Sequence, residues 1–174
     1  FRPPVMDMSA VMPYIQAQQA FDEEYPHGMR YYWKSTNVNH LDDAVIDRIA
    51  HHARLQPSPL STIDIWHIGG AVKRGSSEDS AFYGRHAAFL VNPEANWVHQ
   101  EDDLANINWA RNVVDALKPF SDGSRYLNFG GFQEEADQMM LDGYGPHYRR
   151  LAALKKKYDP DNLFHLNQNI RPEA

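Results

Sequence analysis

Three side chains suited to contacting a substrate lie within four positions, in the stretch SRYLNFGG at 124–131. Tyr126 offers a hydroxyl, Asn128 an amide that both donates and accepts hydrogen bonds, and Phe129 a flat ring. If the stretch is a strand, its period of two places Tyr126 and Asn128 on one face and Leu127 and Phe129 on the other. A strand end that packs into a core would have the same composition, so the residues alone leave both interpretations open.

Polar side chains also occur on two other predicted strands. The stretch STIDIWHIGG at 61–70 alternates, and this places Asp64 and Trp66 on one face and His67 on the other. A buried carboxylate needs a partner, which Lys34 or Arg85 could supply. Asp64 therefore belongs either to an ion pair at a sheet edge or to the wall of a pocket.

Near the C-terminus, Asn167, Gln168 and Asn169 place three amides in succession beside Ile170. Amides suit a polar heterocycle whose edge alternates acceptors and donors, but they also suit a solvated, capped terminus.

Composition and missing motifs exclude several classes of function. A formal net charge of −6 without a basic face argues against nucleic-acid binding. The absence of cysteine excludes disulfides and thiolate metal sites within the chain, although it does not fix the compartment. No apolar run approaches the ~18 residues of a membrane span. Since no GxGxxG, GxxxxGK[ST], HExxH or GxSxG pattern occurs, neither a self-contained nucleotide site nor a metal site is predicted.

Hydrophobic periodicity predicts the elements that position these residues. Before residue 119 it indicates helices near 10–24, 41–55 and 101–118, and strands near 29–38, 61–70 and 80–92. This order predicts an α+β lobe with an antiparallel sheet flanked by helices. From Phe120 the pattern changes to a short RYLNF segment, helices near 133–142 and 146–158, and a non-repetitive tail. We therefore divide the chain into 1–119 and 120–174.

The stretches YLNF and YGPHYRRLAALKKKYDPDNLFHLNQNI closely resemble the C-terminal segment of berberine bridge enzyme-like, FAD-linked oxidases. These belong to the vanillyl-alcohol-oxidase-type flavoprotein superfamily. Upstream, PSPLSTIDIWHIGGAV and SAFYGRHAAF resemble the substrate-domain half of its bacterial members. The resemblance implies that 1–119 is part of a substrate-binding domain. It also implies that 120–174 is the mostly helical segment that packs on the flavin domain in relatives.

The resemblance also implies a cofactor, partners and site residues. Family members bind FAD through an N-terminal half, which this chain lacks, and transfer a hydride from a small-molecule substrate to flavin N5, often with oxygen as the final acceptor. Carried over by motif, Asn128 and Gln168 are cofactor-side residues and Tyr126 is a wall of the pocket. Trp66, Ile68 and Arg85 come from segments that line the substrate side in relatives, and we expect them to line it here.

Phe129 departs from the family pattern. Many relatives have a tyrosine there, which acts as the catalytic base, and a phenyl ring cannot accept a proton. Three consequences remain open: an amine substrate that needs no strong base, another base, or altered or lost activity. The candidates for another base are Tyr126, Asp64, His67 and Tyr83.

A rival hypothesis is a free-standing binding module without flavin chemistry. The chain opens on Phe1 without a signal-peptide pattern, so we expect a piece of a longer or processed protein, with a cytoplasmic location favoured. In such a piece the flavin-side face should be apolar and prone to self-association.

Overall fold

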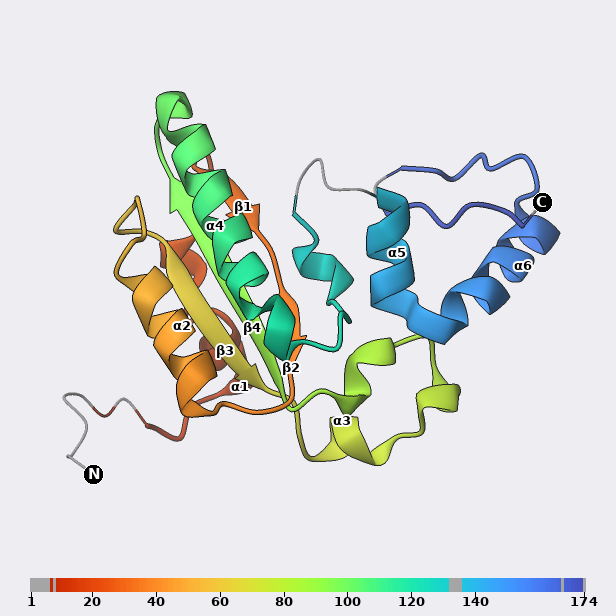
Figure 1. The fold of residues 1–174 in the computed structure, drawn as a ribbon, viewed down its shortest axis with the longest axis horizontal. Coiled ribbons are helices and arrows are strands. Elements are labelled where there is room, and N and C mark those ends of the chain that lie inside the picture. The colour runs from red at the N-terminus through yellow and green to blue at the C-terminus, as the bar shows by residue number, and fades with distance from the viewer. Residues whose placement is uncertain (1–6, 8, 132–135, 167, 174) are drawn as a thin grey trace.

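A computed structural model shows an antiparallel sheet with helices α2 and α4 packed on one face (Figure 1). The structure describes residues 7, 9–131, 136–166 and 168–173. The four strands are β1 (Arg30–Trp33), β2 (Thr36–Val38), β3 (Thr62–His67) and β4 (Phe89–Trp97). Strand β4 is central, with β1 and β2 along one edge and β3 along the other. The predicted α+β class, with an antiparallel sheet flanked by helices, is confirmed.

Strands β1 and β2 are two pieces of one strand, interrupted opposite Pro93. The register continues across the gap, since Trp33 pairs with Glu94 and Thr36 with Val91. The amide of Lys34 donates to the Pro93 carbonyl at 3.3 Å, but proline has no N–H to return the bond. The predicted strand at 29–38 is therefore present, with one break that Pro93 causes.

The strand predicted at 80–92 is wrong in its bounds. Residues Tyr83–His86 form the 3-10 turn η3, and β4 runs from Phe89 through Pro93 to Trp97. A proline normally marks a strand end or an edge, so the prediction stopped too early.

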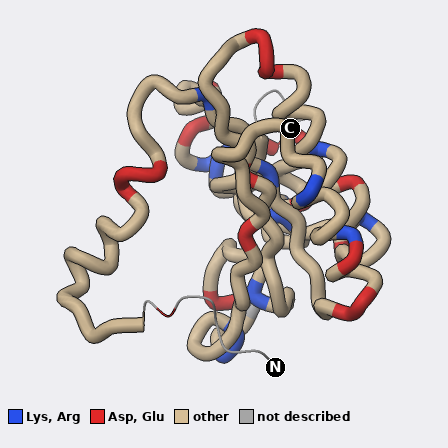
Figure 2. Tube along the Cα trace, turned by 90° about the vertical axis from the view of Figure 1, so that its left-hand side faces the viewer, with Lys and Arg blue, Asp and Glu red and all other residues tan. Residues whose placement is uncertain are grey.

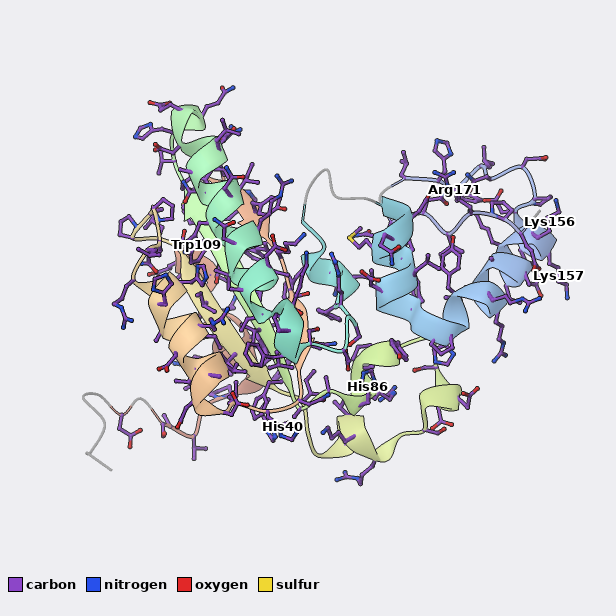
Figure 3. The ribbon with its side chains drawn as sticks, viewed as in Figure 1. His40, His86, Trp109, Lys156, Lys157 and Arg171 are labelled. Atoms are coloured by element: carbon purple, nitrogen blue, oxygen red, sulfur yellow. The ribbon has the colours of Figure 1, made fainter. Side chains whose placement is uncertain are left out.

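The core lies between the sheet and the helices α2 (Asp43–Ala53) and α4 (Asp103–Leu117). Their apolar faces pack on the odd-numbered side chains of β4, including Val91 and Ala95, which are fully buried. Trp109 of α4, labelled in Figure 3, donates its indole N–H to the His52 carbonyl at 2.9 Å and so ties the two helices together. Both helices match their predicted ranges because their apolar residues repeat at helical spacing.

The opposite face of the sheet, which we call the open face, carries the side chains of each strand that point away from the helices. The register places Asn92 of β4 and Asp64 of β3 side by side there. Lys34 faces the helices, on the opposite side of the sheet from Asp64. Lys34, one of the two partners considered for Asp64, is therefore placed away from it.

The C-terminal segment runs along the free edge of β1 and β2, where Gly130 bridges Lys34 and Ser121 bridges Val38. It continues into α5 (Ala136–Tyr144) and α6 (Tyr148–Tyr158), to the right in Figure 1. We had treated the RYLNF segment as a possible strand, and the structure shows that it is not one. It contains the 3-10 turn η6 (Leu127–Phe129).

The remaining elements are short. The predicted helix over 10–24 is reduced to α1 (Tyr14–Gln18) and the 3-10 turn η1 (Asp22–Glu24), within an N-terminal arm that stands away from the body (Figure 2). Helix α3 (Ala71–Arg74) follows β3. Further 3-10 turns are η2 (Ser77–Asp79), η4 (Gln100–Asp102), η5 (Lys118–Phe120) and η7 (Gly145–His147). Across the described residues, no helix has the length and apolar character needed to cross a membrane.

Candidate functional site

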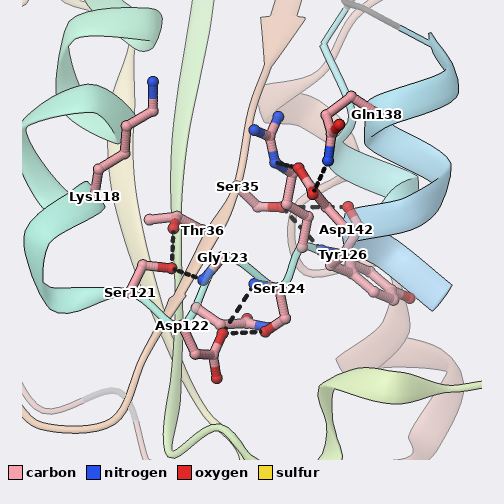
Figure 4. Close-up of polar contacts among 12 residues, drawn as sticks. Ser35, Thr36, Lys118, Ser121, Asp122, Gly123, Ser124, Tyr126, Gln138 and Asp142 are labelled. Atoms are coloured by element: carbon pink, nitrogen blue, oxygen red, sulfur yellow. Dashed lines mark hydrogen bonds and ion pairs between the residues drawn. The ribbon is translucent and has the colours of Figure 1, made fainter. Parts of the chain in front are cut away.

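Ser35 fixes the η6 turn onto the open face of the sheet. Its fully buried hydroxyl donates to the carbonyls of Tyr126 at 3.2 Å and Phe129 at 3.4 Å, and accepts from the Tyr126 amide at 3.4 Å. Figure 4 shows Ser35 beside Tyr126. Because residues three apart lie on the same side of a 3-10 turn, Tyr126 and Phe129 meet, with ring centroids 5.4 Å apart. The predicted alternation, which separated these two rings, is therefore corrected.

A cavity of about 470 Å³ lies beside this turn. It brings together five of the site residues predicted from the sequence: Trp66, Ile68, Tyr126, Asn128 and Phe129. The amide of Asn128 donates to the Tyr126 hydroxyl at 2.8 Å, so the two polar groups at the wall hold each other in place. We call this space the first cavity.

The first cavity also contains a buried polar atom without a partner. Asn37 of β2 is 1% exposed and lines the cavity, and its Oδ1 has no hydrogen-bond partner among the described residues. Its Nδ2 donates to the Ser124 hydroxyl at 2.8 Å, and Ser124 donates to Asp122 at 2.6 Å. A buried amide oxygen without a donor is costly, so Oδ1 is suited to accept from a bound ligand.

Asp122, bonded to Ser124 in Figure 4, continues this chain of bonds to the exposed side chain of His86, labelled in Figure 3, whose Nε2 atom lies 2.5 Å from Asp122 Oδ2. Burial alone would raise the pKa of Asp122, but hydrogen bonds from Ser124 and His86 outweigh it and lower that pKa. The carboxylate is thus kept ionised and holds Ser124 for Asn37.

A second cavity of about 770 Å³ lies across the open face, and Trp66 and Phe129 line both cavities. The second cavity also contains Asp64 and Glu94 from the sheet and Tyr25 from the N-terminal arm. The Phe129 ring stands 5.8 Å from the Trp33 ring and 6.5 Å from the Trp66 ring, measured between centroids. Phe129 is therefore part of the boundary between the two cavities.

Glu94 is a candidate site residue that sequence reasoning missed. It is 3% exposed, and its carboxylate accepts from the Tyr25 hydroxyl at 2.7 Å and from Asn92 Nδ2 at 2.5 Å. Burial raises the pKa of Glu94, and the nearby charge of Asp64 raises it further. Burial and the bond to Glu94 likewise raise the pKa of Tyr25.

A signal for Glu94 was present in the sequence. In FLVNPEANW, Asn92, Glu94 and Asn96 alternate with apolar residues, but this pattern is visible only if the strand continues through Pro93.

The remaining candidates lie elsewhere. Arg85 sits in the η3 turn, so its placement on a strand was wrong, and its guanidinium donates to the Val72 carbonyl and the Ser80 hydroxyl, each at 3.0 Å. Gln168 donates to the Leu127 carbonyl at 3.2 Å and so supports the η6 turn from the tail.

Three of the four candidate bases do not line the second cavity. Tyr83 packs against His86 and His147, with ring centroids 4.9 and 6.4 Å away. His67 lines the first cavity. Of the four candidates, Asp64 alone shares the second cavity with Phe129.

The fold is similar to that of berberine bridge enzyme-like flavoproteins. The structure of BBE-like #28 from Arabidopsis thaliana matches 94% of this chain with a TM-score of 0.79 at 17% identity, which shows the fold alone. The 6-hydroxy-D-nicotine oxidase of Arthrobacter nicotinovorans matches 97% of the chain with a TM-score of 0.77 at 25% identity.

Sequence comparison gives the family. Residues 125–171 match the family model described as berberine and berberine like, so this segment belongs to that family. An FAD-linked oxidoreductase of Dictyostelium discoideum is 30% identical over 99% of the chain. The chain spans 37% of that relative's length, and 40% and 38% of the two solved structures. It is therefore homologous to part of an FAD-linked oxidoreductase.

The residues present fit the ring part of the FAD that these relatives imply. The first cavity combines apolar walls with a buried acceptor, Asn37 Oδ1, and with the polar groups of Tyr126 and Asn128. A flavin ring is likewise flat and apolar with a hydrogen-bonding edge. The sequence has no glycine-rich dinucleotide fingerprint, so the fit is to the ring and not to the phosphates.

Proposed function

We propose that this chain supplies the substrate-binding part of an FAD-linked oxidoreductase that oxidises a small alcohol or amine. In this proposal the division at residue 119 separates the sheet, which binds substrate, from the segment that contacts the flavin. When bound, the flavin supplies the hydride acceptor, and Asn128, Tyr126 and Asn37 would hold its ring. Gln168 would act indirectly, because it holds the η6 turn.

Glu94 carries the proposal. In a relative with tyrosine at position 129 the phenol takes the substrate proton, which Phe129 cannot do. Glu94 lines the same cavity as Phe129, is buried, and has a pKa moved upward toward the neutral range in which general bases work best. Glu94, oriented by Tyr25 and Asn92, would therefore accept the proton from the substrate O–H or N–H as the adjacent C–H loses its hydride.

Of the open consequences of Phe129, this arrangement favours another base over lost activity, and it serves an amine as well as an alcohol. The names of relatives include both chemistries, since a nicotine is an amine and a chitooligosaccharide carries hydroxyls. The rival binding module is not favoured, because the chain is homologous to named oxidoreductases along nearly its whole length.

The test is Glu94→Gln in the flavin-loaded full-length protein. Losing a general base should lower kcat for flavin reduction by about 10²–10⁴-fold. The visible flavin spectrum should persist, because Glu94 is not assigned to cofactor binding. Asp47→Asn, at an exposed position of α2, is the matched control and should leave the rate unchanged. An unchanged rate in Glu94→Gln would reject this assignment.

A further inference from the structure

One part of the second cavity combines aromatic rings with carboxylates. We call this part the acidic compartment and define it by Tyr25, Trp33, Asp64 and Glu94. Glu24 of the N-terminal arm lines the same cavity. The Tyr25 and Trp33 rings meet edge to face, with centroids 5.4 Å apart and planes at 74°. Such a contact leaves ring faces free for other groups.

Among the described residues, no positive charge balances these carboxylates. None of the described residues that line the cavity is lysine, arginine or histidine. Within the described part of the chain, neither Asp64 nor Glu94 has a cation at ion-pair distance. Asp64 and Glu94 occupy diagonal positions on neighbouring strands of the open face, where like charges repel.

We propose that the acidic compartment binds a positively charged nitrogen group of the substrate. Aromatic faces attract organic cations, and the attraction is stronger where the site excludes water. The carboxylates add charge complementarity at short range. This inference rests on the proposed function, for which it narrows the substrate class to alcohols and amines that carry a positively charged nitrogen.

An organic cation suits the compartment better than a metal ion. No group of three or more potential metal ligands occurs among the described residues. Aromatic side chains line the same cavity as the carboxylates, and hard metal ions prefer surrounding oxygen ligands. Trp66 and Phe129 continue into the first cavity, so the ligand should carry an apolar body beside its charged nitrogen.

Buried charge in the compartment gives the binding a pH dependence. Tyr25, Asp64 and Glu24 are the titratable groups that share the cavity with Glu94. Since the pKa of Glu94 is raised and a cation favours the ionised carboxylate, affinity should increase as pH rises through that pKa. A neutral ligand should show no such increase.

Choline and 3,3-dimethylbutan-1-ol test the charge directly, because they have nearly the same shape and differ in the positive nitrogen. Binding is measured by calorimetry on the flavin-loaded full-length protein. Choline should bind at least about tenfold more tightly than the neutral alcohol, which corresponds to ~1.4 kcal/mol. Equal affinities would overturn the inference.

Variants identify the compartment as the place of binding. Asp64→Asn should weaken choline binding about fivefold or more and leave the neutral alcohol unaffected, as expected from an ion pair of ~1 kcal/mol. Trp33→Leu should weaken it similarly, and Trp33→Phe should retain it because the aromatic face remains. Asp47→Asn is the charge-matched control. If Asp64→Asn and the control behave alike, the cation is bound elsewhere and the inference fails.

Binding and turnover separate this inference from the proposed function. Selective choline binding without any oxidase activity would leave the compartment intact as a cation site and reject the proposed function. Oxidation of neutral alcohols without preference for choline would support the proposed function and reject the cation site.

Discussion

The burial of Glu94 lowers the stability of the fold, although the proposed function needs its carboxylate. It lies on the central strand, where a carboxylate is costly to bury, and its neighbours do not include a cation among the described residues. A raised pKa in the folded state means that ionisation opposes folding. The contribution of Glu94 to stability is therefore fully present below its unfolded value, near 4.5, and is lost as pH rises through the folded value.

Glu94→Gln should therefore raise the melting temperature at pH 7, although it should abolish the proposed proton transfer. The new amide can donate to Asn92 Oδ1, which has no partner in the described structure, once the Asn92 amide turns over. The gain should shrink toward pH 4, where the native carboxyl is protonated as well. Thermal unfolding across this pH range is the measurement, and a variant less stable than the parent at pH 7 would contradict the expectation.

Phe129 offers the complementary experiment. Its ring lies between the two cavities, so Phe129→Tyr places a hydroxyl near where the family's base stands. In the full-length holoenzyme the variant should oxidise alcohols at least about tenfold faster relative to amines, because alcohols depend more on a base. Phe82→Tyr adds the same hydroxyl at another wall of the first cavity and serves as the control. If the rates of alcohol and amine oxidation changed by the same factor, the result would argue that position 129 is not where a base acts.

At the scale of elements, the helices and strands that local periodicity determines were predicted from the sequence. Helices α2 and α4 were placed within a few residues because their apolar stripes repeat every three to four positions. Strand β3 was placed by its alternation. The α+β class followed from the order of these elements.

Two elements escaped prediction because long-range contacts decide them. The η6 turn is held by Ser35, which lies 91 residues away from Tyr126 and could not be inferred from local sequence. Strand β4 continues through Pro93 because partners on both edges fix it. Missing the second half of β4 also meant missing Glu94. Several residues predicted around Tyr126 do line one cavity, whereas the acidic compartment was only partly anticipated.

Helix α5 supports the η6 turn through a close contact at Gly143. A Cβ atom built there would overlap the side chain of Leu127, the first residue of the turn. Gly143→Ala should therefore destabilise the protein by about 1–2 kcal/mol, although alanine favours a helix over glycine. Chemical denaturation gives the free energy of unfolding.

A double variant tests the cause of that loss. Leu127→Ala removes the obstacle, so adding Gly143→Ala to it should be neutral or stabilising by up to ~1 kcal/mol. Ala153→Ser, at an exposed position of α6, controls for helix substitutions in general. Additive losses in the double variant would show that Gly143 acts through something other than Leu127.

At the scale of the whole molecule, acidic and basic residues are spread over the chain without forming a single basic face (Figure 2). Among the exposed apolar side chains, one group lies on the N-terminal arm and another on the C-terminal tail. The N-terminal arm exposes Tyr14, Ile15 and Phe21, and the C-terminal tail exposes Leu163, Phe164 and Leu166 at 72, 77 and 81%. Relatives are more than twice as long as this chain. We propose that, in the full-length protein, a flavin-binding half like theirs covers the exposed arm and tail.

The tail gives a direct test of that idea. The 174-residue chain by itself should self-associate, and its mean mass by light scattering should rise with concentration. Replacing Leu163, Phe164 and Leu166 by serine should suppress the rise, because it removes the apolar contact area. A Val98→Ser/Leu104→Ser variant, which changes side chains 54 and 75% exposed near the start of α4, should not. The same triple change in the full-length protein should instead loosen the tail that Gln168 connects to η6, and flavin should be released more readily on dilution. A chain that is monomeric at every concentration, together with unchanged flavin retention, would show that the tail needs no cover.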